Sequence, residues 1–153
     1  MRLKIFIDGS ARGNPGPGSC AAIIKDASGK TLKESGLHLG SCTNDFAEYS
    51  ALMLALRESS RLGGEALQIF SDSELLVRQF NGINEIQSPE LSTFMHKIRL
   101  QAKNFSEMSL AHISGEMNRE ADREANRVLD AALEGKKDVS DGKDGGPSQL
   151  SFY

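Results

Sequence analysis

Four carboxylates in this 153-residue chain, Asp8, Glu48, Asp72 and Asp122, lie within or at the ends of apolar segments. Asp8 and Asp72 each end a strand-like run, whereas Glu48 and Asp122 lie inside apolar helical stretches. Like charges in such surroundings repel one another and lose hydration, so they persist only when they are protonated or neutralised by cations. Mg²⁺ or Mn²⁺ with oxygen ligands meets this need. Paired hard metal ions held by carboxylates indicate phosphodiester hydrolysis.

The elements that would position these acids follow from the apolar periodicity and from turn and capping residues. Three successive strands followed by strands that alternate with helices indicate the α/β class, with a five-stranded mixed sheet and helices on both faces. The expected elements are strands at Leu3–Asp8, Ser19–Lys25 and Thr31–Leu39, a helix capped by Thr43 and ending near Arg61, a strand at Ala66–Ser71, a helix from Ser73 to about Phe80, a helix capped by Ser88 and continuing through Ala102, a strand at Met108–Ile113, and a helix from Asn118 to about Leu133.

This arrangement predicts that the acids meet. In open α/β sheets, reactive groups collect where strands end, so Asp8 and Asp72 converge if their strands are neighbours. Glu48 shares a helical face with the apolar residue four positions on, and Asp122 shares one with the apolar residues three and seven positions on. We therefore expect all four side chains to point inward to one pocket.

Composition sets limits on the class of protein. The length suits one domain, and 39% hydrophobic and 25% charged residues are ordinary for a globular chain. No segment approaches the roughly 18 apolar residues of a membrane span, and the N-terminus is typical of a strand rather than a signal peptide. Cys20 and Cys42 lack metal-ligand spacing and are expected to be buried thiols in a reducing cytoplasm. We expect residues 1–133 to form the domain and 134–153, rich in Gly, Asp, Lys and Ser, to be a disordered tail.

The net charge of −3 is unfavourable for a nucleic-acid partner but does not exclude one. Acidic residues are concentrated toward the C-terminus, whereas the first sixty residues are close to neutral. The charge therefore predicts weak, salt-sensitive binding to a polyanion.

The segment Asp8–Gly18, rich in glycine and proline, is the most specific in the chain. A phosphate-binding loop is excluded because Ser19 and Cys20 follow where Lys and Ser/Thr are required. An Asp-x-Asp phosphatase nucleophile is excluded because Ser10 stands at the second acidic position.

Taken together, the motifs resemble the ribonuclease H family over about residues 1–133. The resemblance is to the smaller prokaryotic type 1-like branch. It rests on four segments in family order, which are Asp8-Gly-Ser with Gly13-Asn14-Pro15-Gly16-Pro17-Gly18, Thr43-Asn44-x-x-Ala47-Glu48, Ser71-Asp72-Ser73, and Asn118-x-x-Ala121-Asp122. It implies a metal-dependent endonuclease that cuts the RNA strand of RNA–DNA hybrids with two Mg²⁺ or Mn²⁺ ions and no organic cofactor, leaving 5′-phosphate and 3′-hydroxyl ends.

The resemblance also assigns residue roles. Asp8, Glu48, Asp72 and Asp122 match the catalytic metal ligands, and Glu48 also matches the residue that contacts a ribose 2′-hydroxyl, the group that distinguishes RNA from DNA. Asn14 and Asn44 match minor-groove contacts, and Thr43 matches a contact to a DNA phosphate. These substrate-binding assignments have plainer alternatives, since Thr43 is also a helix cap and Asn14 can simply shape its turn.

Three departures from the family pattern keep other functions open. Glu74 stands where many members carry glutamine, Ser114–Met117 replaces a loop that often carries a catalytic histidine, and Asn81–Gln87 lacks the Lys and Arg of a basic protrusion. These favour an alternative, a nucleic-acid-binding module with weak or no catalysis. A second alternative is hydrolysis of double-stranded RNA, because the 2′-hydroxyl contact does not require DNA opposite. The expected protein is a cytoplasmic monomer without a membrane partner.

Overall fold

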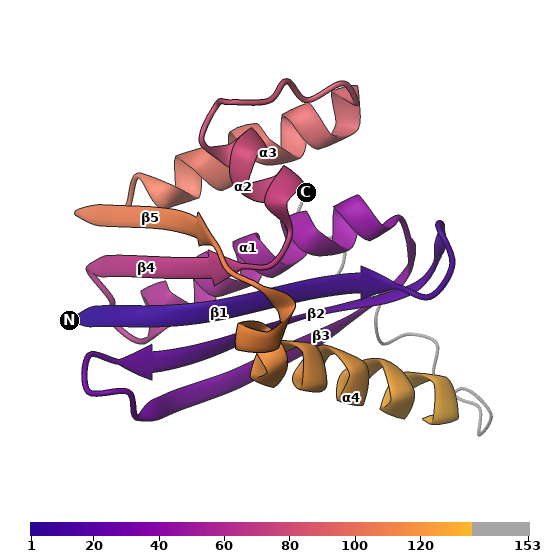
Figure 1. Cartoon of the computed structure of the whole chain (residues 1–153), viewed down its shortest axis with the longest axis horizontal. Helices are drawn as coiled ribbons and strands as arrows, with labels where there is room; N and C mark the ends of the chain where they lie inside the picture. The colour runs from indigo at the N-terminus through magenta and orange to yellow at the C-terminus, as the bar shows by residue number, and fades with distance from the viewer. Residues whose placement is uncertain (136–153) are drawn as a thin grey trace.

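The computed structural model describes residues 1–135 as one mixed sheet with helices packed around it (Figure 1). The predicted tail at 136–153 lies outside the described residues. The elements are β1 (Arg2–Ala11), β2 (Gly16–Asp26), β3 (Thr31–Cys42), α1 (Asn44–Arg61), β4 (Ala66–Ser71), α2 (Glu74–Phe80), α3 (Pro89–Ala102), β5 (Glu107–His112), the 3₁₀ helix η1 (Gly115–Asn118) and α4 (Arg119–Gly135).

The five strands lie in the order β3-β2-β1-β4-β5. The first three form an antiparallel meander, and β4 and β5 run parallel to β1. The α/β class and the mixed five-stranded sheet predicted from the sequence are confirmed. The order places β4 directly beside β1, so the carboxyl ends of these two parallel strands lie together.

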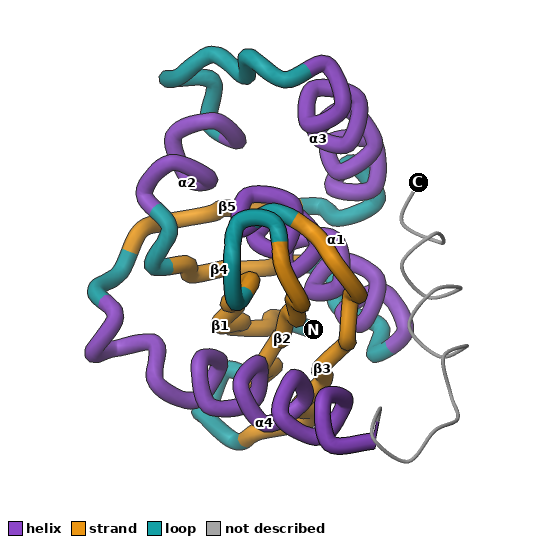
Figure 2. Tube along the Cα trace, turned by 90° about the vertical axis from the view of Figure 1, so that its right-hand side faces the viewer, coloured by secondary structure: helices purple, strands orange, loops and turns teal. Residues whose placement is uncertain are grey.

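Helices cover both faces of the sheet (Figure 2). On one face α1 packs across β1 and β2, and buried Ile5, Ile7 and Leu52 belong to the main core there. On the other face α4 packs on β1, β2 and β3. The buried Ser19 hydroxyl of β2 donates a 2.6 Å hydrogen bond to the Ala125 carbonyl of α4, which fixes that helix to the sheet.

Helix starts agree with the capping residues in the sequence. The hydroxyl oxygens of Thr43, Ser73 and Ser88 accept the backbone N–H groups three residues onward at 3.1, 3.2 and 3.2 Å. Each such cap stabilises a helix by about 1 kcal/mol. The caps therefore set where α1, α2 and α3 begin.

Several boundaries differ from the sequence prediction. β2 begins at Gly16 rather than Ser19, and β3 continues to Cys42 rather than ending at Leu39. β1 continues beyond Asp8 to Ala11 because its ladder with β2 extends to the Ala11–Gly18 pair, whereas its pairing with β4 stops at Ile7 and Ser71. The last helix continues to Gly135 rather than ending near residue 133.

In residues 1–135, no helix combines the length and the apolar character needed to cross a bilayer.

Candidate active site

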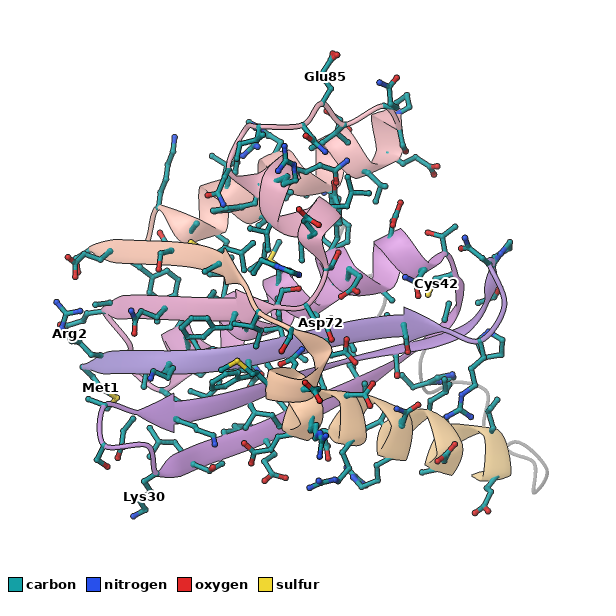
Figure 3. All side chains as sticks on the ribbon, in the orientation of Figure 1. Met1, Arg2, Lys30, Cys42, Asp72 and Glu85 are labelled. Carbon is teal, nitrogen blue, oxygen red and sulfur yellow. The ribbon has the colours of Figure 1, made fainter. Side chains whose placement is uncertain are left out.

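Three of the four carboxylates converge at the carboxyl end of β1 and β4. Asp8 lies on β1, Glu48 on α1, and Asp72 directly after β4, where Figure 3 labels it near the middle of the molecule. One oxygen from each of these side chains lies within 4.8 Å of the other two. Asp8 is 6% exposed and Glu48 is 8% exposed, whereas Asp72 is half-buried.

A backbone contact at Gly9 brings Glu48 to this position. A Cβ atom at Gly9 would lie 2.1 Å from the Ala47 carbonyl oxygen, so only glycine lets α1 approach β1 this closely. The Gly9 N–H also donates a buried 3.1 Å hydrogen bond to Glu48 Oε1. The Asp8-Gly pair therefore supplies one carboxylate and the space and donor that place a second.

Asp122 joins the site differently from the prediction. It is exposed rather than inward-facing, because the inward side of α4 is occupied by Ala121, Ala125 and Leu129 and the next residue turns about 100° away. Asp122 nevertheless lies close enough to Asp8 to raise the pKa of that carboxyl group. Asp122 therefore lies beside Asp8, at the edge of the three-carboxylate group.

Asn118 holds the start of α4 against the sheet. Its buried Nδ2 donates a 2.8 Å hydrogen bond to the Ile7 carbonyl, one residue before Asp8. The sequence motif contained Asn118 but gave it no role. The only signal was its place three residues before an alanine and four before an acid, which does not reveal a partner 111 positions away.

Crowding of negative charge perturbs the two buried carboxyl groups. Burial raises the pKa of Asp8 to about 8, and the charges of Asp72 and Asp122 and the hydrogen bond with Asp122 add to this effect. Burial is also the main cause that raises the pKa of Glu48 to about 9. The charges of Asp8 and Asp72 raise it further, and the hydrogen bond from the Gly9 N–H lowers it. Both groups hold a proton near neutral pH unless positive charge is brought in.

The donor set fits a divalent cation. Within residues 1–135 no Lys or Arg forms an ion pair with any of the four carboxylates. The site therefore offers only oxygen ligands, and no cationic side chain in residues 1–135 is paired with them to neutralise their charge when they ionise. Such a set suits hard ions such as Mg²⁺ and Mn²⁺ rather than thiolate- or imidazole-seeking metals.

Three of the four predicted substrate-contact residues, Asn14, Thr43 and Asn44, lie together on the surface. The Asn44 N–H donates to Asn14 Oδ1 at 3.0 Å, and the Ala11 N–H donates to Asn44 Oδ1 at 3.2 Å. These bonds tie the loop between β1 and β2 to the start of α1. Asn14 and Thr43 also line an open groove of about 500 Å³ between that loop and the start of α3. Asn14 and Thr43 therefore have the structural roles of holding a loop and capping a helix, and both also line a groove that is open to solvent.

The loop after β5 passes close to Asp72. A Cβ atom at Gly115 would lie 3.7 Å from Asp72 Oδ2, so this loop presents backbone rather than a titratable side chain at the point of contact. Glu74 is exposed and pairs loosely with Arg78 at 3.9 Å.

The sheet order, the helices on opposite faces and the acids at the ends of β1 and β4 define a ribonuclease H-like α/β domain with a carboxylate centre suited to metal ions. The sequence profile described as Reverse transcriptase-like matches residues 6–128. Ribonuclease HI of Halobacterium salinarum is 32% identical over 131 residues, covering 86% of this chain and 66% of that protein. A bifunctional protein of Mycobacterium tuberculosis is 33% identical over 135 residues, covering 88% of this chain and 37% of that protein.

Solved structures agree with these relationships. RNase H1 from the halophilic archaeon Halobacterium salinarum superposes with a TM-score of 0.84 at 31% identity, and the match covers 86% of this chain and 99% of that one. LC11-RNase H1, in complex with an RNA/DNA hybrid, superposes with a TM-score of 0.82 at 36% identity, covering 86% and 99%. The chain belongs to the ribonuclease H family. It spans about two thirds of the archaeal relative and about a third of the mycobacterial one.

Proposed function

We propose that this chain is a metal-dependent endonuclease that hydrolyses the RNA strand of RNA–DNA hybrids. The observation that carries the proposal is the meeting of Asp8, Glu48 and Asp72 within 4.8 Å, two of them buried and none paired with a cationic side chain in residues 1–135. A protein fold retains such mutual repulsion at a cost in stability, which a cation-dependent function explains. Substrate class is inferred from LC11-RNase H1, which binds an RNA/DNA hybrid.

The four acids take the metal-binding and catalytic roles. When bound, two hard divalent cations supply an activated water and neutralise the charge on the phosphate and the departing 3′-oxygen. Asp8, Glu48 and Asp72 would hold the cations, with Asp122 beside Asp8 as the fourth carboxylate. Cleavage on the 3′-oxygen side of the phosphate leaves 5′-phosphate and 3′-hydroxyl ends.

Recognition of the hybrid is assigned to residues beside this centre. Glu48 contacts a ribose 2′-hydroxyl, and its orientation is held by the Gly9 N–H. Asn14 and Asn44 contact the minor groove from the surface where the two side chains are already linked. Thr43, at the N-terminus of α1, receives a DNA-strand phosphate, because the helix dipole favours an anion there.

We also propose that the protein acts as a cytoplasmic monomer with Mg²⁺ or Mn²⁺ as its only cofactor. Two free, buried thiols, Cys20 and Cys42, support a reducing compartment. Size-exclusion chromatography with light scattering tests the oligomeric state, and localisation of the tagged protein tests the compartment.

The direct test compares cleavage of end-labelled RNA–DNA hybrid, duplex RNA and duplex DNA, each with and without Mg²⁺. Only the RNA strand of the hybrid should be cut, only with metal, and the products should accept ligation at a 5′-phosphate. Asp72→Asn should lose activity while retaining its thermal transition, and Glu107→Gln, which removes an exposed acid paired with Arg2, should remain active.

Full cleavage by Asp72→Asn would remove that residue from the mechanism. Hybrid binding without any cleavage would establish the binding-module alternative, and equal cutting of duplex RNA would widen the substrate class.

A further inference from the structure

The outward face of α4 carries a second surface feature, a groove of about 630 Å³ that begins at Asp122. Arg119, Arg123 and Arg127 recur at four-residue intervals along it, about 6 Å apart along the helix axis. We call it the arginine groove, and its lining residues are Arg119, Asp122, Arg123, Asn126, Arg127 and Asp130.

A further arginine reaches the groove from a distant part of the chain. Arg12, in the loop after β1, donates to Asn126 Oδ1 at 3.2 Å and pairs with Asp130 at 2.7 Å. Arg127 is similarly engaged, forming a two-pronged pair with Glu124 at 2.7 and 2.9 Å. The far part of the groove is therefore internally neutralised and held in shape.

Arg119 and Arg123, which flank Asp122, are different. Both are exposed, and neither forms an ion pair within the part of the chain that the structure describes. Two like-charged guanidinium groups one helical turn apart repel each other and gain nothing from the fold. Their planar, two-pronged donor geometry matches phosphate oxygens.

The opposite flank of the site offers little such charge. The loop between α2 and α3, residues 81–87, contains no Lys or Arg. Of its flanking arginines, Arg78 is engaged by Glu74 and Asn84, and Arg99 donates to the carbonyls of Gln79 and Phe80 at 2.9 and 3.2 Å. In residues 1–135, Arg119 and Arg123 thus combine a position beside Asp122 with the absence of an ion pair.

We propose that Arg119 and Arg123 bind backbone phosphates of the RNA strand next to the bond that is cut. This rests on the proposed function, since a strand whose scissile phosphate lies at Asp122 continues onto the groove that begins there. The two arginines of the groove supply a local electrostatic attraction for the nucleic acid, which the chain's net charge of −3 does not provide.

The test compares wild-type protein with Arg119→Gln/Arg123→Gln in binding a labelled hybrid across a salt series, by fluorescence anisotropy in EDTA so that no cleavage occurs. Loss of two phosphate contacts should make the fall of log K, the binding constant, with log salt less steep by about 1.8. The ratio of wild-type to variant affinity should therefore decrease roughly 60-fold between 0.1 and 1 M salt. Arg2→Gln/Arg61→Gln is the charge-matched control, and Figure 3 shows Arg2 at the amino end of β1, away from Asp72.

Equal slopes for the α4 variant and the control would overturn the groove proposal while leaving the nuclease proposal intact. A wild-type protein that neither binds nor cuts hybrid would overturn both. Repeating the titration with an uncharged peptide nucleic acid in place of the DNA strand assigns the contacts. The difference in salt slope between the wild type and the α4 variant should persist. If it disappears, the two arginines contact the DNA strand, and the assignment to the RNA strand is refuted.

Discussion

Stability without metal should fall as pH rises, because the carboxylate centre must then hold charges that it cannot neutralise. The perturbation is a pH series from 5 to 9 on protein stripped of metal with EDTA. The relevant groups are Asp8, whose pKa rises from an ordinary 3.8 to about 8, and Glu48, whose pKa rises from 4.5 to about 9. Both side chains are buried, so solvent screens the effect little.

The sign follows from proton linkage. Between about pH 5 and 8 the folded state keeps protons on Asp8 and Glu48 that the unfolded state has released. Stability is therefore complete below the unfolded pKa values and is lost as pH rises through the folded values. Each group contributes on the order of 1 kcal/mol per pH unit in this range, so the free energy of unfolding should fall by up to about 3 kcal/mol per unit.

Thermal unfolding followed by circular dichroism measures this slope. A change of that size should lower Tm by several degrees per pH unit in a domain of this length. Mg²⁺ should raise Tm most at the high-pH end and flatten the slope, because cations favour the ionised carboxylates. A metal-free Tm that is constant or rises between pH 5 and 8 would refute the account of a charge-frustrated centre.

Three substitutions test how the site is positioned. Gly9→Ala places a methyl group 2.1 Å from the Ala47 carbonyl oxygen. It should lower the free energy of unfolding in urea by about 1–3 kcal/mol or more and remove most of the nuclease activity. An unchanged free energy of unfolding would show that α1 can shift to make room. Asn118→Ala removes the 2.8 Å hydrogen bond to the Ile7 carbonyl. It should lower the free energy of unfolding by about 1–3 kcal/mol and weaken Mg²⁺ binding in a calorimetric titration. Mg²⁺ affinity equal to that of the wild type would show that Asn118 does not position the site. Thr43→Ala should lose about 1 kcal/mol, which Thr43→Ser should recover; equal loss in both would argue against the cap.

The sequence determined the local features of this protein. Caps at Thr43 and Ser88 depend on a hydroxyl and an N–H three residues onward, so pattern alone placed these two helix starts. Apolar alternation likewise placed Asp8 and Asp72 at the ends of buried runs. The family motifs predicted all four acids as metal ligands, because a motif is read from residue types and their order along the chain.

Only the tertiary structure decided how these features meet. Which strand pairs with β1 depends on long-range hydrogen bonding, and it placed Asp72 level with Asp8. Asp122 is exposed because apolar residues already fill the inward face of α4. The bond from Asn118 to β1 spans 111 positions, and the arginine groove combines one helix with Arg12, which is 114 positions from its partner Asn126. Contacts between residues so far apart leave no local periodicity, because they arise from packing of finished elements rather than from the preferences of neighbouring residues.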